Sequence, residues 1–219
     1  MAPKNSQLSK EKLISLYMEY TLEHNEKPKS VYLFCKQHHF TEADFYAYFG
    51  TLESMEKEIY KLFLDKTVAL LQQDPNYADY DLKNKMLSFY FTFFELLKAN
   101  RSYVTQSLNS SKNHLKDWIQ LSALRTAFLD YVADIIPDDQ RIKQEKLQKI
   151  QQKALQESAW IQLLMALKFW LEDASANFEK TDIYIEKSVK LSFELMQVAP
   201  IDSLIDFGKF MFKEKIQKK

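Results

Sequence analysis

Glycine and proline are scarce in this chain of 219 residues, which contains two glycines and five prolines. Tight turns, β-bulges and phosphate-binding loops usually need glycine, because glycine reaches backbone conformations that other residues avoid. The scarcity therefore argues against β-rich folds and against dinucleotide-binding folds. Hydrophobic residues make up 46% of the chain and charged residues 27%, which is typical of a mostly helical globular protein.

Cysteine occurs only once, and long apolar runs and a net charge are missing. The single cysteine, Cys35, excludes an intramolecular disulfide framework and fits a reducing cytosol, so we expect a cytoplasmic protein. The first residues contain no apolar segment of the kind found in signal peptides. No apolar run approaches the ~20 residues of a membrane-spanning helix. The 30 basic and 30 acidic residues cancel, so overall charge favours neither nucleic acid nor an anionic membrane.

Motifs for catalysis or metal binding are absent as well. The four histidines, His24, His38, His39 and His114, include no pair at i,i+4 spacing, and the sequence has no HExxH, CxxC or glycine-rich phosphate loop. We therefore expect no catalytic residue, no metal site and no cofactor, and we interpret the chain as something other than an enzyme.

What is present is helical periodicity, and no stretch alternates as a strand would. Ser9, Ser30 and Thr41 each precede an apolar periodic segment, where their hydroxyls can cap the free N–H groups of a helix start. Thr41 and Asp44 also have the spacing of a capping box. The first third of the chain is therefore predicted to hold three short helices, followed by a longer one that Thr51 opens.

The longer helix is expected to run to about residue 73, and Asp74-Pro75-Asn76 is the clearest linker. Beyond it we expect helices at about 81–99, 102–110, 114–136, 138–173 and 178–198, and a terminal amphipathic helix over 201–219. The pattern predicts two domains, residues 1–73 and residues 74–219.

The segment around residues 30–49 has the features of a helix-turn-helix. Phe34 and Cys35 on one helix, and Phe40 and Phe45 beyond the turn, supply an apolar wedge that fixes how the two helices cross. Such a corner can present its second helix to a major groove.

The segment Phe45-Tyr46-Ala47-Tyr48-Phe49, with Leu52-Glu53-Ser54-Met55 after it, resembles the TetR family of bacterial repressors. The resemblance covers roughly residues 10–64. It implies an all-α, TetR-like fold, in which an N-terminal three-helix helix-turn-helix domain joins a larger helical domain for ligand binding and dimerisation. It also places Ser30, Thr41, Tyr46 and Tyr48 at or near the DNA backbone. The candidate DNA-binding residues are Ser30, Lys36, His39, Thr41, Glu42, Tyr46 and Tyr48.

Several positions depart from the family pattern. His38-His39 replaces the Ala-Gly that is usual in the turn, and histidine takes a left-handed conformation at a cost that glycine avoids. Leu52 replaces a lysine, which removes a phosphate contact. Residues 1–60 hold seven lysines and nine acidic residues, a net charge of −2, although DNA affinity depends heavily on phosphate neutralisation. An acidic recognition helix can instead accept hydrogen bonds from cytosine amino groups.

Residues 170–189 are similar to the closing segment of the coenzyme Q biosynthesis lipid-binding proteins, through Asp173, Ser175, Phe178 and Thr181. Those proteins share the TetR fold, so the resemblance implies a lipid-like ligand. We prefer a structural interpretation, in which Ser175 or Asn177 N-caps the helix that begins near Phe178.

The terminal segment 201–219 combines an apolar face with a lysine-rich end. Such a helix can make peripheral membrane contact, as the lipid-binding family implies. The alternative, which we prefer, is a helix packed on its own domain with a frayed lysine tail.

Phenylalanine gathers in the segment 89–94, where Phe89 and Phe93 share one helical face with Leu97. A helix that is apolar nearly all round is central to a bundle or lines a cavity. The TetR resemblance implies a ligand cavity between such helices. The candidate ligand-binding residues are Phe89, Phe93, Phe94, Trp118, Leu121, Trp160 and Leu164. We expect a homodimer through Trp160, Leu164, Leu167 and Leu171, together with Ile185, Val189 and Phe193.

Two functions fit these features. The first is a TetR-like transcriptional regulator that binds a palindromic operator in double-stranded DNA and responds to a small apolar ligand. The alternative is a lipid carrier or accessory protein that keeps the fold without binding DNA. The aromatic pattern from Phe45 to Phe49 favours the first function, and the acidic start of the recognition helix favours the second.

Overall fold

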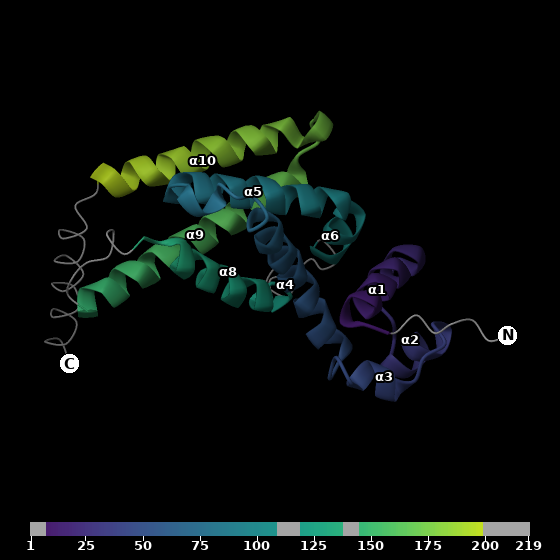
Figure 1. The fold of residues 1–219 in the computed structure, drawn as a ribbon. Coiled ribbons are helices and arrows are strands. Elements are labelled where there is room, and N and C mark those ends of the chain that lie inside the picture. The colour runs from purple at the N-terminus through teal and green to yellow at the C-terminus, as the bar shows by residue number, and fades with distance from the viewer. Residues whose placement is uncertain (1–7, 109–118, 138–144, 199–219) are drawn as a thin grey trace, which may run out of the picture. The chain divides into compact units, whose positions relative to one another are not determined.

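The computed structural model describes residues 8–108, 119–137 and 145–198. The regular secondary structure of these ranges consists of helices and includes no strand, which confirms the predicted all-α fold class (Figure 1). The α-helices are α1 (Lys10–His24), α2 (Val31–Gln37), α3 (Glu42–Tyr46), α4 (Leu52–Leu71), α5 (Leu82–Ala99), α6 (Arg101–Leu108), α8 (Ser122–Ile135), α9 (Glu145–Glu172) and α10 (Glu179–Val198). Short 3-10 turns lie at Tyr77–Asp79 and Ala176–Phe178.

The chain forms two compact units, and each unit draws on two stretches of sequence. Unit 1 comprises Met1–Leu70 and Thr92–Phe128, and unit 2 comprises Leu71–Phe91 and Leu129–Lys219. The domain division predicted between residues 73 and 74 stays a prediction. The predicted terminal helix at 201–219 and its membrane contact lie outside the described residues, as does Trp118.

The first helices of unit 1 begin where the sequence predicts. The Ser9 hydroxyl accepts from the main-chain N–H of Lys12, and the Ser30 hydroxyl accepts from Leu33, each at 3.2 Å. Thr41 and Asp44 form the predicted capping box at the start of α3. Capping satisfies N–H groups that have no partner inside the helix, so these three caps fix where α1, α2 and α3 start.

Aromatic side chains make up much of the core around these helices. Phe34 on α2 and Phe45 on α3 are fully buried, and their ring centroids lie 6.3 Å apart in an edge-to-face arrangement. Phe34 also packs edge-to-face against Phe40, with centroids 5.5 Å apart. Cys35 is buried beside them, as predicted. Edge-to-face pairs are favourable because a positive ring edge meets a negative ring face.

In unit 2, α9 and α10 run side by side and are joined by residues 173–178 (Figure 1). The cap of α10 agrees with the prediction for Ser175 but not for Asn177, and it also includes Asp173, which was not predicted. The buried Asp173 carboxylate accepts from the N–H of Thr181 at 3.0 Å and from its hydroxyl at 2.7 Å, and from the N–H and hydroxyl of Ser175. Asn177 does not cap but turns the chain in a left-handed conformation, with φ 52°.

The hydrogen bonds of this cap also change the pKa of the Asp173 carboxyl. Burial raises the pKa of this carboxyl, but the hydrogen bonds from Ser175 and Thr181 outweigh burial and lower the pKa to about 2. The Ser175 hydroxyl accepts from the N–H of Lys180 at 3.3 Å, so Ser175 contributes to the helix start as predicted. Asp173, Ser175 and Thr181, which are among the residues that resemble the lipid-binding proteins, therefore have a structural role in the turn before α10.

The predicted dimer surface on α9 and α10 is wrong for its central residues. Ile185 is completely buried and Val189 is 1% exposed within the single chain, and Trp160 and Leu167 are buried as well. Side chains that are already enclosed within the single chain cannot form the surface that meets a second copy. Large apolar side chains are instead exposed on other faces: Ile161, Met165 and Phe169 on α9, and Ile183, Leu191 and Leu195 on α10.

Candidate functional site

The turn between α2 and α3 contains a left-handed residue where the sequence predicts one. His39 has φ 61°, and the main-chain N–H of Phe40 donates to the Cys35 oxygen at 3.1 Å. The N–H of His38 donates to the Phe34 oxygen at 3.2 Å. These bonds close the last turn of α2, so the chain reverses sharply enough for α3 to pack back on α2 through Phe34 and Phe45.

All seven candidate DNA-binding residues are exposed, on α2, on α3 and on the segments that flank them. Their hydrogen-bonding capacity differs. The Thr41 hydroxyl donates to Asp44 at 2.7 Å, and the Tyr48 hydroxyl donates to the main-chain oxygen of Leu8 at 2.7 Å. Within the described residues, the hydroxyls of Ser30 and Tyr46 donate to no protein group. Among the seven candidates, Ser30 and Tyr46 therefore retain hydroxyl groups that can donate to a phosphate.

Sequence reasoning missed two exposed apolar residues on α2. Tyr32 is 55% exposed and Leu33 is 47% exposed, and the Lys36 ammonium lies 5.8 Å from the centroid of the Tyr32 ring. Phe34 and Cys35, the next two residues of α2, are buried. Helical periodicity around the buried Phe34 could have identified Tyr32 and Leu33.

The buried Cys35 thiol has low reactivity. Burial, together with the charges of Glu42 and Asp44, raises its pKa to about 11. A thiol with a raised pKa is a poor nucleophile, so Cys35 acts as a small apolar side chain in the α2–α3 packing.

A buried carboxylate holds the helix-turn-helix against α4. Glu56 on α4 is 5% exposed, accepts a hydrogen bond from the Tyr17 hydroxyl of α1, and pairs with Lys27 of the α1–α2 segment at 2.7 Å. Burial and the Glu56 charge both raise the pKa of Tyr17, so Tyr17 stays protonated and donates. One carboxylate thus ties three elements of unit 1 together.

Helix α6 is joined to α1 and to α4 by adjacent side chains. The Gln106 amide donates to the main-chain oxygen of Thr21 on α1 at 2.9 Å. The Ser107 hydroxyl is hydrogen-bonded to the Tyr60 hydroxyl of α4. The Gln120 amide donates to the Ser107 main-chain oxygen at 3.4 Å, and the Gln120 side-chain oxygen is buried with no hydrogen-bond partner among the residues that the structure describes. A displacement of α6 would therefore disturb two helices at once.

Comparison with known proteins assigns the fold to a family. The model of the tetracyclin repressor-like C-terminal domain matches residues 85–211, more than half of the chain. The chain belongs to the TetR family. The match runs from within α5 past the end of α10, whereas the aromatic pattern of residues 45–49 lies in the N-terminal part outside it. No curated protein matches the chain, and the resemblance to the coenzyme Q lipid-binding proteins receives no support.

The candidate ligand-binding residues of this TetR-family protein are divided between its two units. Phe93, Phe94 and Leu121 are buried in unit 1. Phe89 and Trp160 are buried in unit 2 and Leu164 is half-buried there, with the Phe89 ring stacked on Tyr131 at a centroid distance of 4.7 Å. Membership of a common ligand site stays a prediction for this set.

Metal-binding clusters and membrane-spanning helices are both missing from the part of the chain that the structure describes. Over residues 8–108, 119–137 and 145–198, no group of three or more His, Cys, Asp or Glu side chains could hold a metal ion. None of the helices in those ranges combines the length and apolar character needed to cross a membrane.

Proposed function

We propose that this TetR-family protein is a dimeric transcriptional regulator, which binds double-stranded DNA through α2 and α3 and releases it when a small apolar ligand binds. The geometry of the helix-turn-helix carries the proposal. His39 supplies the left-handed turn, and the Thr41–Asp44 capping box starts α3. Tyr46, the last residue of α3, is 53% exposed, and its hydroxyl donates to no group among the described residues. A helix presented in this way can enter a major groove.

Few groups in this arrangement can contact the phosphate backbone of DNA. Ser30 and Tyr46 can donate to phosphate oxygens, and Lys36 adds a positive charge at the exposed end of α2. Phosphate contacts set the position of a protein on the duplex. Because each half-site gains few cation–phosphate pairs, the affinity should depend only weakly on salt concentration.

A second copy of the chain is proposed to cover the exposed apolar residues of α9 and α10. Ile161, Met165 and Phe169 are spaced at i, i+4 and i+8, so they form one stripe on α9. Phe169 stacks on Tyr184 of α10 at a centroid distance of 4.6 Å, which makes the apolar surface continuous from helix to helix. Leu191 and Leu195 lie further along α10.

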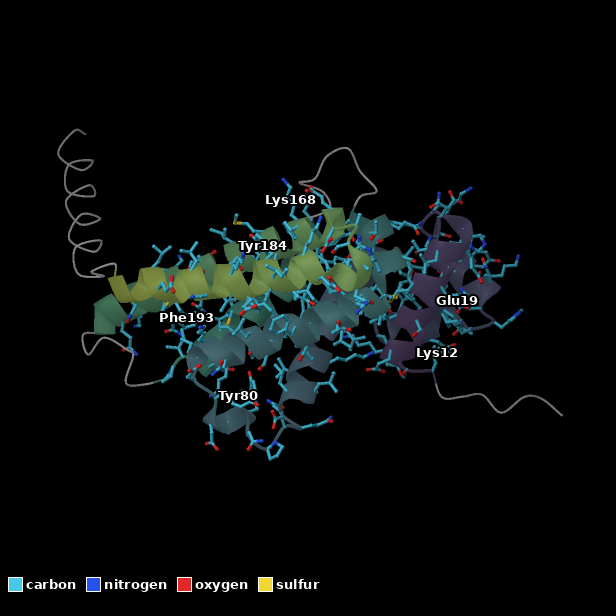
Figure 2. All side chains as sticks on the ribbon, turned by 90° about the horizontal axis from the view of Figure 1, so that it is seen from above. Lys12, Glu19, Tyr80, Lys168, Tyr184 and Phe193 are labelled. Atoms are coloured by element: carbon cyan, nitrogen blue, oxygen red, sulfur yellow. The ribbon has the colours of Figure 1, made fainter. Side chains whose placement is uncertain are left out.

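The arrangement of α9 and α10 suits a two-fold dimer. Figure 2 shows the side chains of Lys168, Tyr184 and Phe193 along these two helices. Gln162 on α9 is hydrogen-bonded to Ser188 and Ser192 on α10, each at 3.3 Å. These bonds hold α9 and α10 together. Two such pairs, related by a two-fold axis, would bury both apolar stripes in a four-helix bundle.

Ligand binding would act through helix position. In a dimer, two recognition helices fit two half-sites only at one spacing. A ligand that favours a different position of α6 would strain the Gln106–Thr21 and Ser107–Tyr60 bonds and shift α1 and α4 with it. Coupling of this kind is typically about 1–3 kcal/mol, enough for about a 5- to 150-fold change in DNA affinity.

The experiment that tests DNA binding uses the full chain and sheared genomic DNA from its source, retained at low and moderate salt and then sequenced. The expected result is one enriched palindromic site, which Tyr46→Ala loses while remaining a dimer. Leu70→Ala, an exposed substitution on α4, is the matched control and should retain the site. Enrichment that Tyr46→Ala leaves unchanged would contradict the docking proposed here.

A lipid or apolar-ligand carrier without DNA binding is the second candidate. Charge favours it, because residues 8–60 hold six lysines and nine acidic residues. Failure to enrich any DNA at either salt concentration would support the carrier. Extraction of the purified protein with organic solvent, followed by mass spectrometry, would then be expected to reveal a bound apolar molecule.

A further inference from the structure

The two carboxylates at the start of α3 are in different situations. Asp44 accepts from the N–H of Thr41 at 2.8 Å and from its hydroxyl at 2.7 Å, so it is committed to the capping box. Glu42 is exposed and, within the described residues, takes part in no hydrogen bond or ion pair. Capping therefore explains Asp44, whereas Glu42 contributes only its charge to the first turn of α3.

Within the described residues, no lysine pairs with Glu42. Lys10 is paired with Glu58 at 2.5 Å and Lys27 with Glu56 at 2.7 Å. Lys36, on α2, lies over the Tyr32 ring. Glu42 thus presents an uncompensated carboxylate on the first residue of α3, the helix that follows the turn (Figure 1).

The chemistry of a carboxylate restricts what it can contact there. The first residues of the second helix in a helix-turn-helix contact base edges. An ionised carboxylate only accepts hydrogen bonds, and it is repelled by phosphate. In the major groove it pairs with the amino group of cytosine, whereas the guanine edge and the thymine oxygen present acceptors that it cannot bond.

We propose that Glu42 is a specificity-determining residue, which accepts a hydrogen bond from a cytosine amino group in each half-site of the operator. This inference rests on the proposed DNA-binding function. It adds that both half-sites carry a C·G pair at the base that Glu42 reaches.

The proposal predicts a change of sequence preference. The Glu42→Gln side chain keeps one acceptor and gains an amide donor, and glutamine pairs in a bidentate manner with adenine. The preferred base should therefore change from cytosine to adenine. The discrimination between the two bases should be roughly 5- to 150-fold, as for a single base contact.

The test selects bound sequences from one randomised double-stranded DNA pool with the full chain and with Glu42→Gln. Glu23→Gln, an exposed substitution on α1 that removes the same charge, is the matched control. The expected result is a symmetric site with cytosine for the unchanged chain and for Glu23→Gln, and adenine at the same position for Glu42→Gln. Equal thermal unfolding temperatures would show that all three proteins fold.

Two other results would overturn the proposal, and they differ in what else they overturn. A symmetric site that Glu42→Gln selects with an unchanged base at every position would remove the role of Glu42 and keep DNA binding. No enriched site for the unchanged chain would remove both the inference and the proposed DNA-binding function.

Discussion

The Gln106 side chain of α6 donates a hydrogen bond to the main-chain oxygen of Thr21 on α1, 85 residues earlier in the chain, at 2.9 Å. This bond connects α6 to α1, the helix that precedes the helix-turn-helix. Both residues lie in unit 1. The bond therefore offers a direct route by which a change in α6 could reach the helices proposed to bind DNA.

Gln106→Ala should remove this connection without creating a buried charge. Because a single hydrogen bond is lost, the free energy of unfolding should fall by about 1 kcal/mol. Urea unfolding followed by circular dichroism measures the change. Ser102→Ala, at an exposed position of the same helix, should have no comparable effect. Equal stability of the two variants would mean that the Gln106 bond contributes nothing.

Glu56 should matter more for stability than its partner Lys27. Glu56→Ala leaves the buried Tyr17 hydroxyl without an acceptor, which should cost about 1–3 kcal/mol. Lys27 is about half exposed, so solvent screening limits the loss from Lys27→Ala to about 1 kcal/mol. Urea unfolding of the two variants gives the order, and a larger loss for Lys27→Ala would contradict the assigned role of Glu56.

His38 should make the stability of the protein depend on pH. Burial lowers its pKa below 6.5, an effect that Lys12 and His24 reinforce and that Glu19 and Glu23 oppose. The unfolded chain therefore takes up the proton first, and stability is lost as pH falls below about 6.5 until the folded-state pKa is passed.

His38→Phe should remove this part of the pH dependence, since phenylalanine suits the aromatic surroundings formed by Tyr20, Phe34 and Phe40. Thermal unfolding temperatures between about pH 5 and pH 7.5 measure it. His39→Asn removes an exposed histidine and should leave the dependence in place. Identical pH profiles for the original chain and His38→Phe would refute the prediction.

His39→Gly should stabilise the protein. A non-glycine residue at φ 61° costs roughly 1 kcal/mol or more, and glycine removes that cost, although its greater freedom in the unfolded chain offsets part of the gain. The expected rise in the free energy of unfolding is about 0.5–1 kcal/mol. His39→Ala keeps the steric cost and should give no rise, so a gain in both variants would point to another cause.

Met165→Glu and Leu191→Glu should each weaken the proposed dimer. Both side chains are more than half exposed in the single chain, so the unit should fold normally while the interface gains charges that cannot be paired. A tenfold rise in the dimer dissociation constant, about 1.4 kcal/mol, is the smallest effect expected. Analytical ultracentrifugation measures it. Leu70→Glu, at an exposed apolar position of α4 outside the proposed interface, is the control; dimers that survive both substitutions on α9 and α10 would place the interface elsewhere.

Local features were predictable because their contacts are local. The caps at Ser9, Ser30 and Thr41 join residues three positions apart, a spacing that can be recognised in any sequence. The Asp173 cap was not predicted correctly, because its carboxylate reaches eight residues ahead to Thr181 across an irregular turn. The left-handed His39 followed from its place in the turn and not from its own preference.

The sequence by itself determined the helical class, the starts of α1 to α3 and the aromatic wedge of the helix-turn-helix, since periodicity and capping act within a few residues. Only the tertiary structure decided which apolar face of α9 and α10 is enclosed. Both helices carry apolar side chains on more than one face, so periodicity cannot tell Ile185 and Val189, which are buried, from Leu191 and Leu195, which are exposed. Packing against other helices makes that choice, because it fixes the rotation of each helix about its axis.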